Sequence, residues 1–145
     1  MQYAAQFPHQ VASLTIASAH LGLKSDEERQ KRIAEDAAWA QSLLESNIDE
    51  FLHRWYNRPI FGGFRPDLTM RRKHNPELLA RCLTHHSLGR QPLLSPKNAL
   101  FVVGERDEKY RALFPDAVII PGAAHMVHLE NPRAFAQIIK KRILS

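Results

Sequence analysis

Apolar residues form short continuous runs near the two ends of the chain, with a different pattern between them. The run at 11–18 is rich in β-branched and apolar residues, which predicts a buried strand. Two further runs, at about 99–103 and 117–120, predict strands in the C-terminal third. From about Pro132 to Leu144 the spacing predicts a closing amphipathic helix. The apolar face of that helix would hold Phe135, Ile138, Ile139 and Ile143.

The middle of the chain carries apolar residues at helical spacing instead. Ser25, with Glu28 three residues later, has the pattern of a capping box and predicts the start of a helix. A second helix is expected from Asn47 to Tyr56. Further helices are expected over Asp67 to Lys73 and over Pro76 to Ser87.

The first residues resemble the last turns of a helix that runs directly into a strand. Pro8 would end this helix, and we expect a strand before it that these 145 residues do not include. The layout predicts an α/β protein with about three parallel strands, flanking helices and a helical insertion. We divide it into a helix end and strand of the core at 1–19, a helical cap at 20–92, and a second part of the core at 93–145.

Length and composition indicate a globular domain. At 145 residues, 44% of them hydrophobic and 24% charged, the chain is too balanced for disorder. Its apolar runs span only a few residues, so we expect no membrane segment, and Met1–Ala5 lacks the features of a signal peptide. The single cysteine, Cys82, fits a reducing cytoplasm, and its helical surroundings predict a buried or half-buried thiol.

The net charge of +5 could indicate a nucleic-acid partner, but the distribution of basic residues argues against one. They are mostly interspersed with acids, and the one dense cluster, Arg71–His74, has no aromatic residues interleaved with it. We therefore expect a solvated face, or a pocket for an acidic small molecule, and no nucleic acid.

Candidate chemistry follows the last two predicted strands. Gly104–Asp107 comes after one strand and Pro121–Pro132, which contains His125, after the next. An acid and then a histidine at successive strand ends are two of the three members of an α/β-hydrolase triad. A buried Asp107 could orient the imidazole of His125, although Asp107 could equally be a turn residue. The chain order requires a serine upstream on a G-x-S-x-G turn, and the sequence contains no such turn.

The other histidines carry weaker signals. His125 and His128 have the spacing of a metal pair, but no cysteine or ligand cluster accompanies them, so we expect neither a metal nor another cofactor. His128 with Glu130 is expected to support the loop. The other six histidines are interpreted as surface or satisfied core residues.

Several segments resemble one family within the α/β-hydrolase superfamily. They are Gln2–Pro8, Glu27–Arg32 with Asp36, Trp55–Phe61, Arg71 before Asn75–Glu77, and Ser87–Pro92. The family is 2-succinyl-6-hydroxy-2,4-cyclohexadiene-1-carboxylate synthase, a lyase of menaquinone (vitamin K2) biosynthesis. The resemblance spans essentially the whole chain, and the Trp55–Phe61 segment with its flanking arginines is its most discriminating part.

The resemblance implies elimination of pyruvate from a cyclohexene that carries several carboxylates, with a polycarboxylate as the small-molecule substrate. Asp107 would orient His125, and His125 would pair with a serine.

Further residues match the family's substrate-binding positions. Arg32 and Arg71 would hold substrate carboxylates through their guanidinium forks. Trp55 and Phe61, with Tyr56 beside them, would form aromatic walls of the pocket. Without the resemblance, the arginines would be interpreted as solvated helix charges and the aromatic residues as packing within the cap.

The sequence also departs from the family pattern. Ala124 replaces the glycine usual before the histidine, so we expect some strain in that turn. The connection between the last two strands has only about a dozen residues.

The serine and oxyanion-hole segments are expected to precede Met1, which predicts a fragment that is inactive alone and a further half-chain as partner. The alternatives are part of another α/β-hydrolase, acting on an ester or a carbon–carbon bond, and a non-catalytic module that binds an acidic metabolite.

Overall fold

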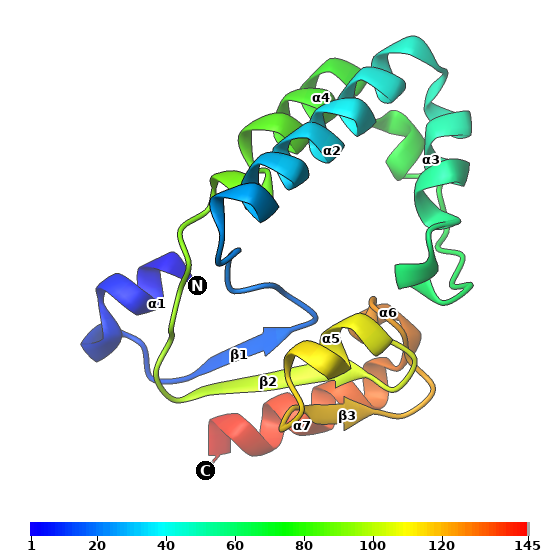
Figure 1. Cartoon of the computed structure of the whole chain (residues 1–145). Helices are drawn as coiled ribbons and strands as arrows, with labels where there is room; N and C mark the ends of the chain where they lie inside the picture. The colour runs from blue at the N-terminus through cyan, green and yellow to red at the C-terminus, as the bar shows by residue number, and fades with distance from the viewer. Residues whose placement is uncertain (145) are drawn as a thin grey trace. The chain divides into compact units, whose positions relative to one another are not determined.

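A computed structural model describes residues 1–144 of the chain, and its strands form a three-stranded parallel sheet (Figure 1). The strands are β1 (Leu14–Ala17), β2 (Ala99–Gly104) and β3 (Val118–Ile120), in the order β1-β2-β3. The α-helices are α1 (Gln2–Gln6), α2 (Asp26–Glu45), α3 (Ile48–Tyr56), α4 (Pro76–His85), α5 (Glu108–Leu113), α6 (Val127–Glu130) and α7 (Pro132–Leu144). Single 3₁₀ turns are η1 (Pro8–Gln10), η2 (Pro59–Phe61), η3 (Arg71–Lys73) and η4 (Leu88–Arg90).

The residues group by their contacts into two compact units. The core unit consists of Met1–Ala19, Arg58–Phe64 and the chain from Leu94 onward. The helical unit consists of His20–Asn57 and Arg65–Leu93. The segment Arg58–Phe64 thus groups with the core unit, although both of its chain neighbours are in the helical unit.

The sheet of the core unit has the parallel register expected of an α/β fold. Leu14 of β1 pairs with Ala99 of β2, and Val102 of β2 pairs with Val118 of β3. Because all three strands run in the same direction, their carboxyl ends lie at one edge of the sheet. The segments that follow β2 and β3 therefore start from the same edge. The predicted parallel strands with flanking helices are confirmed.

The centre of the core unit is fully buried. Val102, Ile120, Ala123 and Val127 form its cluster, and Phe135 and Ile138 of α7 pack against them. Helix α7 has the predicted bounds, but its apolar face is shorter than predicted. Ile143 is 68% exposed, because it lies in the last turn, beyond the residues that reach the cluster.

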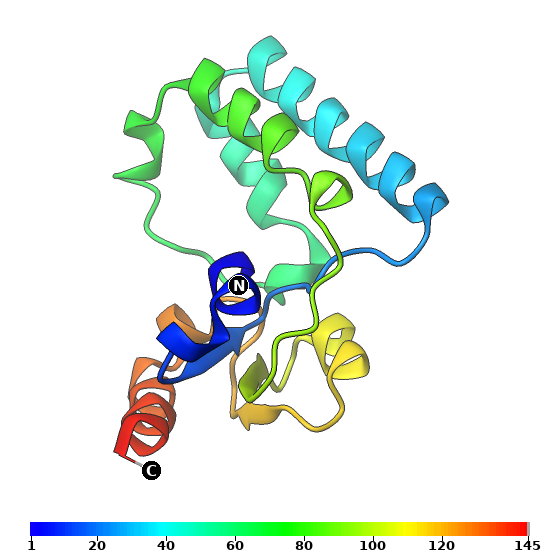
Figure 2. The same cartoon turned by 90° about the vertical axis from the view of Figure 1, so that its left-hand side faces the viewer.

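The helical unit is built on α2 and α4, which lie side by side (Figure 2). Its first helix begins with the predicted capping box: the Ser25 Oγ accepts the Glu28 N–H at 3.1 Å, and Glu28 Oε2 accepts the Ser25 N–H at 3.0 Å. An aromatic cluster joins α2 to α3, with Trp39 edge-on to both Phe51 and Trp55.

Two expectations about this unit are wrong. Asp67 to Lys73 is not a helix but ends in the single turn η3, because Asp67 Oδ1 accepts the Thr69 N–H at 2.9 Å and its O–H at 2.7 Å. Such a side-chain bond satisfies the backbone outside a helix. Cys82 is exposed on α4 rather than buried. Across residues 1–144, no helix has the length and apolar character needed to cross a membrane.

Candidate active site

Two polar side chains meet at the carboxyl edge of the sheet. Asp107 follows β2 and caps α5, where its Oδ1 accepts the Tyr110 N–H at 3.3 Å. His125 lies in the loop between β3 and α6, and its Nδ1 is 2.9 Å from Asp107 Oδ2. The Asp107 side chain is 1% exposed and that of His125 is 21% exposed. A carboxylate can only accept, so this bond places the proton on Nδ1 and leaves Nε2 free to accept a proton.

Aromatic rings surround the imidazole. Phe61, from η2, is edge-on to His125 with the ring centroids 6.1 Å apart, and Tyr110 is tilted at 5.1 Å. Both aromatic residues are buried. The predicted pocket residue Phe61 therefore lies against the candidate catalytic histidine, within the core unit.

The expected strain at Ala124 is absent. Among the described non-glycine residues, only Ser18 and Asn98 have positive φ, so Ala124 has an ordinary backbone conformation. Its methyl group is fully buried and faces Gly62, where an added Cβ would lie 2.8 Å from that of Ala124. Because Gly62 has no side chain, there is room for the methyl group of Ala124.

The end of β2 also approaches the histidine loop closely. A Cβ on Gly104 would lie 2.0 Å from the carbonyl oxygen of Ala124, a distance at which no side chain fits. This contact brings the strand end before Asp107 next to the residue before His125.

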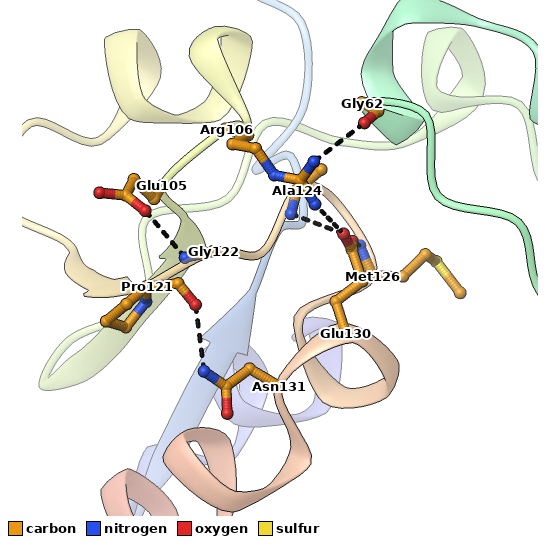
Figure 3. A network of polar contacts seen from close by, with 9 residues as sticks. All are labelled: Gly62, Glu105, Arg106, Pro121, Gly122, Ala124, Met126, Glu130 and Asn131. Carbon is orange, nitrogen blue, oxygen red and sulfur yellow. Dashed lines mark hydrogen bonds and ion pairs between the residues drawn. The ribbon is translucent and has the colours of Figure 1, made fainter.

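Side chains hold the backbone of the histidine loop in place (Figure 3). Glu105 Oε2 accepts the Gly122 N–H at 2.8 Å, and Asn131 Nδ2 donates to the carbonyl of Pro121 at 3.0 Å. Glu130 accepts from two further amides of the loop. Of the pair expected to support this loop, Glu130 does so directly, whereas His128 packs beside Phe135.

The helical unit contains a separate pocket with a volume of about 380 Å³. Four of the predicted substrate-binding residues line it: Arg32, Trp55, Tyr56 and Arg71. Apolar walls come from Phe51, Leu52, Leu79 and Leu83, and polar side chains from Asp36, His74, Cys82 and His86.

The charges of this pocket are partly paired. Arg32 Nε lies 2.8 Å from Asp36 Oδ2, and Asp36 is buried. The Arg71 guanidinium lies 5.3 Å from the centre of the Tyr56 ring, a cation–π distance. Burial raises the pKa of the Tyr56 hydroxyl, and the charge of Arg71 partly opposes that rise. The site thus combines an apolar interior with two guanidinium groups.

Sequence reasoning did not identify His74 and His86 as pocket residues. His74 ends the basic cluster that begins at Arg71, and His86 follows α4, but neither has a neighbour at a spacing that marks a site. Among residues 1–144, no group of three or more His, Cys, Asp or Glu side chains could hold a metal ion.

The fold, together with the Asp107–His125 pair at the ends of two strands, defines the class of protein. A solved structure described as MenH from S. aureus superimposes with a TM-score of 0.78 at 23% identity, covering 92% of this chain and 59% of that one. The chain therefore has the fold of the C-terminal part of an α/β-hydrolase, as predicted.

Curated relatives narrow this class. A Haemophilus influenzae protein provisionally named 2-succinyl-6-hydroxy-2,4-cyclohexadiene-1-carboxylate synthase is 37% identical over 144 residues, which is 89% of this chain and 58% of that protein. A Salmonella heidelberg protein with that name is 34% identical over 149 residues, covering 90% and 59%. No family model matches the chain. The chain is homologous to these synthases over most of its own length and spans about three fifths of theirs.

Proposed function

We propose that this chain is part of a carbon–oxygen lyase of menaquinone biosynthesis, which eliminates pyruvate from a succinylated cyclohexene carboxylate. The observation that carries the proposal is the 2.9 Å contact between His125 Nδ1 and the buried Asp107 carboxylate. The names of the homologous synthases support the choice of substrate.

In this proposal the pair acts on a serine. Nε2 of His125 accepts the proton of the serine hydroxyl, and Asp107 stabilises the imidazolium that forms. The serine lies on a strand-to-helix turn contributed by a segment outside these 145 residues, since none of their serines lies on a G-x-S-x-G turn. We therefore expect the 145-residue chain to be inactive alone.

The pocket of the helical unit would bind the substrate carboxylates. Arg71 and Arg32 are the cationic donors, and the Asp36 carboxylate engages Nε of Arg32, so the terminal nitrogens of Arg32 would contact the ligand. Trp55 and Tyr56 provide apolar walls for the ring. A planar fork bound to a carboxylate in a site of low polarity gives both affinity and orientation.

A chimera tests the catalytic proposal. This chain would be joined to the N-terminal part of the Haemophilus protein, and pyruvate release from the cyclohexene substrate would be followed with a coupled dehydrogenase. We expect His125→Ala and Asp107→Asn to lower kcat by at least a hundredfold, whereas His85→Ala, at an exposed position on α4, should leave it unchanged.

The outcomes separate the candidates. Unchanged pyruvate release by the His125→Ala chimera would exclude a role for the pair. Cleavage of simple aryl esters, without release of pyruvate, would instead favour an ester hydrolase.

A second candidate function is a non-catalytic module that binds an acidic metabolite. It is favoured by one observation: the pocket is lined by residues of the helical unit alone. Trp55 lines the pocket, so its fluorescence should respond when 2-succinylbenzoate, a succinyl-bearing aromatic acid, is added to the isolated chain. We expect Arg71→Met to weaken binding about tenfold or more and Arg81→Met, at an exposed position on α4, to have no effect.

A further inference from the structure

We propose that Glu130 is a positioning residue for the Asp107–His125 pair. Its carboxylate holds the backbone on both sides of His125 and, through Arg106, the backbone next to Asp107. The inference concerns the geometry of the pair, and its importance for catalysis rests on the proposed function.

The first argument is where the Glu130 carboxylate binds. Its Oε2 accepts the Ala124 N–H and its Oε1 accepts the Met126 N–H, each at 3.0 Å (Figure 3). These two amides flank His125 in the sequence. His125 lies in a loop with no strand partner, so the two bonds orient the peptide planes that set the direction of its Cα–Cβ bond.

The second argument is the link to the acid. Arg106 Nη2 lies 3.0 Å from Glu130 Oε2, and the Arg106 N–H donates to the carbonyl of Ala123 at 2.8 Å. Asp107 is the next residue after Arg106. The ion pair therefore ties the turn that carries the acid to the same carboxylate that holds the turn of the histidine.

Arg106 also contacts the segment that carries Phe61, the aromatic neighbour of His125. Arg106 Nη1 donates to the carbonyl of Gly62 at 3.2 Å, directly after Phe61 in the sequence. Phe61 is the ring that packs edge-on against His125. Glu130, through Arg106, thus connects with the segments that carry the acid, the histidine and this aromatic neighbour.

The burial of Glu130 makes these bonds strong. Its side chain is 3% exposed, while that of Arg106 is 51% exposed. A carboxylate removed from water requires partners, and hydrogen bonds to an ionised group are stronger than those between neutral groups. Both carboxylate oxygens have partners here, which favours one fixed orientation of the loop over several.

The same loop provides a matched control. Glu105 also accepts a loop amide, that of Gly122, but it is exposed and its contact does not flank His125. A carboxylate that only stabilises the loop should behave like Glu105. A carboxylate that positions the pair should affect His125 selectively.

The test uses the 145-residue chain labelled with ¹⁵N at histidine and at backbone amides. In the unaltered protein, the His125 imidazole should give a downfield Nδ1–H signal from its bond to Asp107. Asp107→Asn should change this signal, which tests the pair independently of Glu130. Glu130→Gln keeps the size of the side chain, but its single oxygen cannot replace two carboxylate oxygens.

We expect Glu130→Gln to broaden or remove the Nδ1–H signal and to speed amide exchange at Ala124 and Met126 by about tenfold. Glu105→Gln should leave the His125 signal unchanged. Glu130→Asp retains the charge but is too short to reach both amides, so it should give the same loss and provides a second variant if Glu130→Gln unfolds.

Several results would overturn the inference. A folded Glu130 variant with an unaltered His125 signal would show that the carboxylate does not position the pair. Equal effects of Glu105→Gln and Glu130→Gln, or unfolding of both Glu130 variants, would assign Glu130 to general stability instead. If the His125 signal does not respond to Asp107→Asn, the pair itself is not formed and the proposed function fails first.

Discussion

The contact between Gly62 and Ala124 yields a prediction with a definite sign and size. Gly62 has φ of +53°, a region where a side chain costs about 1 kcal/mol. A Cβ at Gly62 would also lie 2.8 Å from the methyl of Ala124, which has no space to move because it is fully buried. Overpacking of this kind costs about 1–3 kcal/mol. We therefore expect Gly62→Ala to destabilise the core unit by about 2–4 kcal/mol.

A double-mutant cycle separates the two terms. Ala124→Gly removes the methyl group, so Gly62→Ala made in that background should avoid the overpacking term of about 1–3 kcal/mol and cost only the positive φ. The two changes should therefore couple favourably. This size of coupling is within reach of equilibrium unfolding measurements.

The assay must follow the core unit itself. Both tryptophans, Trp39 and Trp55, lie in the helical unit, so their fluorescence does not report on the core unit. Urea unfolding should instead be followed through the amide signals of Val102, Val103 and Ile120. A Gly62→Ala variant as stable as the unaltered chain, or a double variant no better than the sum of the singles, would refute the steric argument.

Three further predictions follow from particular contacts. Gly104→Ala places a Cβ 2.0 Å from the Ala124 carbonyl oxygen, so we expect loss of the His125 Nδ1–H signal. The core unit should be destabilised by about 3 kcal/mol or more, measured from the same amide signals. An unaltered Nδ1–H signal would contradict this. Hydrogen bonds from Ser25, led by that of its backbone N–H, hold the pKa of Glu28 below its usual 4.5. The stabilisation from this carboxylate is therefore present above pH 4.5 and lost as the pH falls through its lowered pKa, and carboxyl NMR titration checks it. Ser25→Ala should cost the helical unit about 1 kcal/mol, measured by tryptophan fluorescence in urea, and no loss would show that the cap is not stabilising.

Much of the fold could be predicted because its signals are local. Three apolar runs gave three strands, and the bounds of α7 follow from Pro132 and the helical spacing after it. The capping box of Ser25 and Glu28 marks the start of α2 because the two bonds form within one turn. The prediction of a helix from Asp67 to Lys73 was wrong because a local side-chain hydrogen bond at Asp67 competes with the helix.

Part of the candidate site could also be predicted from the sequence, and part of it could not. The approach of Asp107 and His125 could be predicted, because parallel strands place their carboxyl ends together and both residues follow strand ends. The fit between Gly62 and Ala124 could not, because nothing near either residue indicates which distant segment it faces. The hydrogen bonds from the amides of Ala124 and Met126 to Glu130 could not be predicted either. They depend on the conformation of an irregular loop, which leaves no periodic pattern in the sequence.

The grouping of Arg58–Phe64 with the core unit affects how this protein could be recombined with its relatives. The chain passes between the two units after Ala19, Asn57, Phe64 and Leu93, so no single continuous excision removes the helical unit cleanly. A graft of residues 20–93 from a homologue would also import a foreign counterpart of Phe61 and Gly62, and therefore a foreign partner for the methyl of Ala124. An exchange of the helical unit between such relatives should therefore leave this short segment with the histidine loop that it fits.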